Sequence, residues 1–214
     1  SRMVGGLSIA QIFRNEGKME SGYTFAKKDL TNYYNGNRIA DLSDYHQRFF
    51  IRYKKDYKKV GYSLGLRYDV HRYRNLLFHK DVAFIAPDLS REKYFTYFVK
   101  AEYNSLDSQY FPTRGTQTEV KAEFITSNLY EFHNYALFPI FSFNWRTAAS
   151  ISNRFTFIPH ATVRMLCPGD ADVPLALYNF FGGLYRGLMQ EQQIEMAGVP
   201  YLEISSKNAV NTVG

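Results

Sequence analysis

The stretch VGYSLGLRYDV, residues 60–70, decides the fold class of this chain. Its even positions, from Val60 to Val70, are all apolar or aromatic, and its odd positions, from Gly61 to Asp69, are all small or polar. A period of two places these two sets on opposite faces of an extended strand. We therefore expect residues 60–70 to form a β-strand with one apolar face and one polar face.

The same stretch contains GYSLG, residues 61–65, which matches the G-x-S-x-G motif found around nucleophilic serines. In that motif the chain turns sharply at the serine and continues into a helix. Here the alternation passes through Ser63 without a break, and Asp69 lies too far along the same strand, at about 3.3 Å per residue, to act with it. We therefore expect no catalytic residue in this chain. Hydrolysis through Ser63 stays open as a weaker alternative.

The alternation recurs along most of the chain. The segments that carry it are 48–53, 60–70, 92–103, 116–127, 137–147, 151–165 and 193–204, with weaker candidates at 2–14 and 22–30. Most of these runs are about ten to twelve residues long, whereas ordinary strands have about five or six and a tilted strand that crosses a bilayer needs about 9–11. No convincing helical period spans more than a short stretch. The sequence therefore predicts an all-β fold of antiparallel strands of membrane length.

The two faces of these runs differ in a way that favours a membrane protein. The polar faces carry several Lys, Glu, Arg or Gln side chains, and the apolar faces carry Tyr and Phe near their ends. A transmembrane barrel has a wet interior and an apolar outer band bounded by aromatic residues, whereas a small soluble barrel fills its interior with apolar side chains or a ligand. We expect Tyr62, Val99 and Val120 to face lipid, and Lys121 and Glu123 to face the lumen. A soluble lipid-binding barrel is the alternative.

The connections between the runs alternate in length. Lys54–Lys59 and Thr147–Ser150 are expected as short turns, and Asn104–Arg114 as a turn of about ten residues. His71–Arg91 and Leu166–Met189 are expected as long loops. Outer-membrane barrels have short turns at the periplasmic end and longer loops at the outer end. This pattern also favours a transmembrane barrel.

Composition excludes several other classes of protein. The 214 residues include one cysteine, Cys167, so the sequence offers no disulfide framework and no thiolate metal cluster. It contains no run of about 18 apolar residues, which excludes a transmembrane helix. The net charge of +6 suits anionic lipid or nucleic acid. We interpret the basic run at 52–59 as a solvated hairpin turn and expect no nucleic-acid partner.

A metal site is not expected. The five histidines are His46, His71, His79, His133 and His160. Their spacing fits neither an i, i+4 pair on a helix nor an HExxH motif, and the sequence has no CxxC. We therefore predict no metal and no other cofactor, and we place His160 in the lumen because it lies on a polar face.

A first motif connects the chain to a known family. LDSQYFPTRG, residues 106–115, precedes an expected strand and resembles the D-x-x-x-[YF]-P-T-x-G turn of the surface-antigen, or Omp85-like, barrels. The residues expected to shape this turn are Asp107, Phe111, Pro112, Arg114 and Gly115. Pro112 would fix its own φ, Gly115 would permit a positive φ, and Asp107 would pair with Arg114 across the turn.

A second motif lies in the longest expected loop. FFGGLYRG, residues 180–187, resembles the F-x-G-G … R-G segment near the end of the same barrels. The residues that match are Phe181, Gly182, Gly183, Arg186 and Gly187. In assembly-factor members the arginine of this loop reaches into the lumen, so the resemblance implies that Arg186 contacts a strand there. From the glycines alone, a flexible loop and a loop folded into the lumen are equally open.

Residues 192–199 make the chain most similar to the C-terminal barrel of bacterial patatin-like phospholipases, particularly Bacteroidetes-type ones. The resemblance covers residues 92–205 best. It implies an integral outer-membrane barrel of a Gram-negative bacterium, with about sixteen strands when complete. Residues 1–214 would form one barrel module that holds only part of this barrel, and residues 211–214 would not form a terminal strand.

The resemblance implies a barrel that anchors an attached patatin-type hydrolase domain or helps to move it across the membrane. Its expected partners are outer-membrane lipids and lipopolysaccharide, the attached periplasmic or patatin domain, and further copies of the chain. The main alternative is an Omp85-type assembly factor, or insertase, for outer-membrane proteins. In that alternative a weak seam between the first and last strands templates incoming strands by edge pairing.

Overall fold

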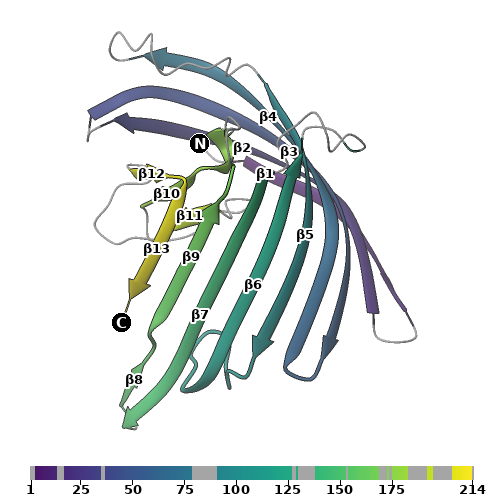
Figure 1. The fold of residues 1–214 in the computed structure, drawn as a ribbon, viewed down its shortest axis with the longest axis vertical. Helices are drawn as coiled ribbons and strands as arrows, with labels where there is room; N and C mark the ends of the chain where they lie inside the picture. The colour runs from purple at the N-terminus through teal and green to yellow at the C-terminus, as the bar shows by residue number, and fades with distance from the viewer. Residues whose placement is uncertain are drawn as a thin grey trace.

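The chain folds into a large curved antiparallel sheet accompanied by a second, small sheet (Figure 1). The computed structural model describes residues 3–13, 17–34, 37–78, 91–126, 129, 138–152, 154–168, 173, 175–182, 192–194 and 204–213. The large sheet contains β1 (Met3–Ile12), β2 (Gly17–Tyr34), β3 (Asn37–Tyr57), β4 (Val60–Phe78), β5 (Glu92–Asn104), β6 (Arg114–Thr126), β7 (Phe138–Ser152), β8 (Phe155–Phe157), β9 (His160–Leu166) and β13 (Asn208–Val213). The small sheet contains β10 (Asn179–Phe181), β11 (Gln193–Ile194) and β12 (Ile204–Ser206), preceded by the 3-10 turn η1 (Leu175–Leu177).

The large sheet is a meander in which sequence neighbours pair side by side. Its order is β1-β2-β3-β4-β5-β6-β7-β9-β13, and β8 pairs with the end of β7. In the small sheet β10 lies between β11, which runs parallel to it, and β12, which runs antiparallel. Figure 1 shows the large sheet twisting into an open trough, as expected for part of a barrel wall. The described residues contain no helix that is long and apolar enough to cross a membrane.

The two faces of the wall confirm the predicted orientation. Tyr62, Val99 and Val120 are exposed at 43%, 57% and 51% on the outer face. Glu123 is 2% exposed on the inner face, and the side chain of Lys121 is 14% exposed beside it. An outer face of exposed apolar side chains is stable only against hydrocarbon, because in water it would be an extensive aggregation surface. The soluble-barrel alternative is therefore disfavoured.

The strands are longer than the alternation predicts. β3 has 21 residues and β4 has 19, and their pairing continues to Tyr57 opposite Val60. The expected turn at Lys54–Lys59 is therefore only the two residues Lys58 and Lys59, with Lys58 at a φ of 53°. At the opposite end β4 continues through the start of the loop expected at His71–Arg91, whose residues 79–90 lie outside the described residues.

For residues 147–165 the predicted turn was wrong, and the predicted strand was confirmed only in part. Thr147–Ser150 is not a turn but lies inside β7, which continues to Ser152. The strand expected over 151–165 is divided into β8 and β9 by Ile158 and Pro159. Proline has no N–H to donate to a ladder, so pairing stops there.

The end of the chain also differs from expectation. The strand predicted over 193–204 does not form as one element, since β11 and β12 lie on opposite sides of β10. We expected no strand near residues 211–214, yet Asn208–Val213 forms β13 and pairs antiparallel with β9. The segment between β9 and β13 therefore leaves the wall, forms the small sheet and returns to the same wall.

Candidate functional site in the lumen

The inner face of the wall encloses a polar cavity of about 470 Å³. Its basic side chains outnumber its acidic ones, and they come from β3, β4, β5, β6 and β9. The charged residues that line it are Arg48, Arg52, Lys54, Arg67, Lys100, Glu102, Glu119, Lys121, Glu123 and Arg164. Ile194 of the small sheet lines the same cavity. The small sheet therefore lies on the lumenal side of the wall.

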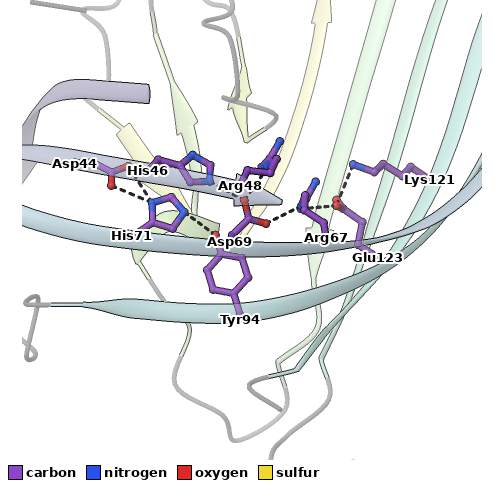
Figure 2. Close-up of polar contacts among 9 residues, drawn as sticks. All are labelled: Asp44, His46, Arg48, Arg67, Asp69, His71, Tyr94, Lys121 and Glu123. Carbon is purple, nitrogen blue, oxygen red and sulfur yellow. Dashed lines mark hydrogen bonds and ion pairs between the residues drawn. The ribbon is translucent and has the colours of Figure 1, made fainter. Parts of the chain in front are cut away.

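Asp69 of β4 is the centre of a buried network of charges (Figure 2). It is fully buried and accepts hydrogen bonds from Arg48 Nε and Arg67 Nε, both at 2.7 Å. Arg67 continues the network through its Nη2, which donates to Glu123 Oε1 at 2.9 Å. Lys121 Nζ lies 2.9 Å from the same oxygen of Glu123. Three adjacent strands are crossed in this way, because Arg67 on β4 reaches Glu123 on β6 past β5.

Two buried histidines extend this network toward the loop end of the strands. His46 and His71 are register partners on β3 and β4, and their rings stack with centroids 3.9 Å apart. His46 Nε2 lies 2.6 Å from Asp69 Oδ1. His71 Nδ1 lies 2.9 Å from Asp44 Oδ2, and its Nε2 lies 2.9 Å from Tyr94 Oη. Each histidine thus contacts a buried carboxylate.

Where β5 and β6 line the cavity, a second group of charged side chains is more exposed to water. Lys100 Nζ on β5 lies 2.6 Å from Glu119 and 2.9 Å from Glu102. These three side chains are 28% to 30% exposed, in contrast to the fully buried Asp69. Water therefore screens this group more than it screens the Asp69 network.

The small sheet is fixed to the inner wall by Arg164 of β9. Arg164 Nη1 donates to Leu177 O at 3.0 Å and to Asn179 Oδ1 at 2.5 Å. Asn179 Nδ2 donates in return to Arg164 O at 3.3 Å and to Lys207 O at 2.8 Å. Asn179 is 0% exposed. This exchange of buried hydrogen bonds holds the start of β10 against β9.

An apolar cluster supports the same attachment. Leu177 of η1 packs into a core built on the inner faces of four neighbouring strands, with Val173 and Ala176 packed against it. The wall residues of this core are Tyr94, Ile125, Ile140 and Leu166. The loop is thus held by both polar and apolar contacts.

The second motif falls partly on the small sheet. Phe181 ends β10, and Gly182 follows it at a φ of 121°, a region that favours glycine. Gly182 N donates to Ile194 O at 3.1 Å, and Gln193 Nε2 donates to Gly182 O at 2.9 Å. Of the two open alternatives for this loop, the described part is folded onto the lumenal face. Gly183, Arg186 and Gly187 lie outside the described residues, so the implied contact of Arg186 stays a prediction.

The first motif forms a compact turn between β5 and β6. Asp107 Oδ1 accepts the backbone N–H of Thr113 at 2.9 Å and that of Arg114 at 3.3 Å, and the Thr113 hydroxyl donates to Asp107 Oδ2. These bonds, those from Thr113 first, lower the pKa of Asp107 to about 2. Asp107 therefore contacts Arg114 through the backbone amide of Arg114. Gly115 has the expected positive φ, at 106°.

The structure also describes the remaining residues of the first motif and two candidates from the sequence, Ser63 and His160. Pro112 is buried in the turn, and Phe111 is 85% exposed beside it. Ser63 lies within β4 and lines the cavity, as expected for a strand residue with no turn at its position. His160 begins β9 opposite Arg146, on the predicted polar face.

The spacing of the histidines along the chain did not predict that His46 and His71 would pair, although the sequence contains a signal for this contact. Counting outward from a two-residue turn at Lys58 and Lys59, the pairing of β3 and β4 places His46 opposite His71 and Arg48 opposite Asp69. The expected six-residue turn hid this register. The paired residues that share a face in a hairpin are therefore the place to look for such sites.

Comparison with known proteins agrees with this architecture. A family model described as the OMP85 superfamily matches residues 8–213. A solved structure of BamA from Haemophilus ducreyi lacking POTRA domains 1-3 matches with a TM-score of 0.60 and 16% identity, over 86% of this chain and 36% of that one. The chain therefore spans little more than a third of the length of that structure. A search of curated proteins finds no match. On the strength of the family match, this chain belongs to the OMP85 superfamily and forms an integral outer-membrane β-barrel wall.

Proposed function

We propose that this barrel is the membrane module of an Omp85-type assembly factor, which inserts other β-barrel proteins into the outer membrane. The observation that carries the proposal is the small sheet held on the lumenal face by Arg164 and Asn179. A barrel that served only as an anchor would need its apolar outer band and nothing more. Burying a charged guanidinium and a carboxamide to hold a second sheet inside the lumen carries a desolvation cost that an anchor has no need to meet.

The mechanism that we propose is physical. The outer band holds the wall in a bilayer of outer-membrane lipids and lipopolysaccharide, while the lumenal sheet supports the wall from inside. A strand of an incoming barrel would then pair with a free edge of the assembled wall through backbone hydrogen bonds. The acidic and basic side chains that line the cavity would keep the lumen hydrated.

A folding assay tests this proposal. The intact protein would be placed in lipid vesicles, and a urea-unfolded outer-membrane barrel protein would be added as substrate. Folding of the substrate is measured by its change in gel mobility and by protease protection. We expect folding to be at least about fivefold faster than in empty vesicles, and equal rates in the two preparations would contradict the proposal. Ser63→Ala lines the cavity with a smaller side chain and should keep full activity.

The resemblance of residues 192–199 to patatin-associated barrels supports a second candidate, a module that anchors or translocates a hydrolase domain. The residues encoded on both sides of this chain distinguish the two candidates: periplasmic repeats favour the assembly factor, and a patatin domain favours the anchor. Phospholipase activity that is lost in Ser63→Ala would instead support hydrolysis by this segment itself.

A further inference from the structure

We propose that Asp44, His46 and His71 bind one divalent transition-metal ion, of the kind that Zn²⁺ represents, on the inner wall of the barrel. One carboxylate oxygen of Asp44 and one ring nitrogen of each histidine all lie within 4.8 Å of one another. All three side chains are at most 4% exposed. The three residues come from β3 and β4, so a bound ion would join these two strands (Figure 2).

The donor set has the chemistry of a zinc-type site. Two imidazoles and one carboxylate are ligands that Zn²⁺, Ni²⁺, Co²⁺ and Cu²⁺ accept, and a water molecule can complete the coordination. Metal–ligand bonds of about 2.0–2.2 Å place the ligand atoms roughly 3.5 Å apart. His71 Nδ1 and Asp44 Oδ2 are 2.9 Å apart, and the ligand atoms of the set all lie within 4.8 Å of one another. Reaching the spacing around a bound ion therefore takes shifts of about 1 Å, which side-chain rotation supplies.

His46 provides the observation that most favours a bound ion. Its Nε2 lies 2.6 Å from the carboxylate of Asp69, which is held as an anion by Arg48 and Arg67. Nε2 therefore carries the proton and donates it to Asp69, and Nδ1 is left with a lone pair. This Nδ1 is buried and has no hydrogen-bond partner within the described part of the chain. A buried acceptor without a partner is costly, and a metal ion would satisfy it.

The surroundings of the two histidines match the outer shell of known metal sites. Histidine ligands commonly donate their second ring N–H to a carboxylate or another oxygen, which fixes the ring orientation. Asp69 does this for His46, and Tyr94 Oη, 2.9 Å from His71 Nε2, can do it for His71. When His71 Nδ1 binds the ion, its single proton resides on Nε2 and is donated to Tyr94. Lys28 lies opposite Asp44 on β2, so we expect weaker binding than at a structural zinc site.

Direct titration tests this site. The intact protein would be purified in detergent without a histidine tag and with Cys167→Ser, because the exposed thiol of Cys167 is itself a metal ligand. Zn²⁺ binding is measured by calorimetry, and Co²⁺ binding by visible absorption. We expect one ion bound per chain, with an affinity that falls at least about tenfold in His46→Ala and in His71→Ala. His160→Ala is the matched control, and its affinity should not change.

Two results would overturn the proposal: a protein that binds no Zn²⁺, or one whose affinity is the same after His46→Ala and His71→Ala. The titration of the unaltered site does not depend on whether these variants fold. Tyr94→Phe provides a milder variant, since it removes only the hydroxyl beside His71 and should weaken binding about tenfold. The substrate-folding assay described above does not depend on added metal, so failure of one proposal is distinguishable from failure of the other.

Discussion

Arg67 and Asp69 lie two residues apart on β4, and both side chains point to the inner face, where Arg67 Nε donates to Asp69 Oδ2 at 2.7 Å. The period of two in the strand allows this contact, since residues i and i+2 share a face. Because Arg67 also reaches Glu123, the pair connects the long hairpin of β3 and β4 to β6. The network therefore links β3, β4 and β6 on the inner side of the wall.

We predict that Asp69→Asn destabilises the wall by about 3 kcal/mol, since it leaves the buried Arg67 and the half-buried Arg48 beside a neutral group. Urea unfolding in lipid vesicles measures this, with fluorescence of Trp145, the sole tryptophan of the sequence, as the signal. Lys100→Gln is the matched control. Its ion pairs are partly exposed, so the expected cost is about 0–1 kcal/mol. Equal costs for the two variants would contradict a special role for the buried network.

The orientation of β6 gives a second prediction. Val120 faces outward and is 51% exposed, whereas Asn144 of β7 lines the cavity beside Glu119. We expect Val120→Arg to cost about 2–4 kcal/mol, because it places a charge in the hydrocarbon. Asn144→Arg should cost less than about 1 kcal/mol, because its charge would meet water and Glu119. Unfolding of both variants in vesicles compares the two faces directly, and the opposite ranking would reverse the assignment of lipid and lumen.

The turn between β5 and β6 depends on Gly115. Its φ of 106° is strained for any residue with a side chain, and an added Cβ would collide with the carbonyl group of Ser105. We predict that Gly115→Ala destabilises the barrel by about 1–3 kcal/mol, measured as a shift of the urea midpoint. Gly5→Ala on β1, where an added Cβ meets nothing within 4 Å, should leave the midpoint almost unchanged.

The same turn gives a prediction about pH. Hydrogen bonds from Thr113 lower the pKa of Asp107 from its ordinary value of 3.8 to about 2. A lowered pKa means that the charged form stabilises the turn above about pH 4, and that this contribution is lost as the pH falls toward 2. NMR titration of ¹³C-labelled aspartate measures the pKa directly. Thr113→Val should raise it toward the ordinary value, and Ser108→Ala, which leaves the Asp107 bonds in place, should not.

Sequence alone predicted most strands of the wall and their faces, because each bilayer-crossing segment has lipid on one side and water on the other. It underestimated their length for the same reason. Above His71, the outer face of β4 carries Arg72 and Arg74, so the contrast between the faces ends while the pairing with β3 continues. The ladder of backbone hydrogen bonds needs no apolar pattern, and a pattern search therefore stops at the edge of the bilayer.

The candidate site was harder to predict than the wall. His46 and His71 lie 25 positions apart in sequence, and only the register of their hairpin brings them together. The small sheet has strands of two or three residues, which are too short to show any periodicity. Its position depends on Arg164 and Asn179, which meet through tertiary contacts that local sequence does not encode.

The attachment of the small sheet gives the last prediction. Arg164→Ala removes the hydrogen bonds to Leu177 and Asn179, and buried bonds to a charged group contribute about 1.5–3 kcal/mol. We therefore expect the open population of the segment between β9 and β13 to rise at least about tenfold. Protease should then cleave this segment correspondingly faster in the intact protein.

Arg146→Ala is the matched control for this experiment. It removes the same kind of side chain from the inner face of β7, but Arg146 donates to Gln117 of the wall rather than to the small sheet. Its cleavage rate in the segment between β9 and β13 should therefore stay near that of the unaltered protein. If the substrate-folding activity also falls in Arg164→Ala and not in Arg146→Ala, the lumenal sheet takes part in assembly. If neither rate nor activity distinguishes the two variants, the sheet is held by its apolar core alone, and the buried arginine carries no role in assembly.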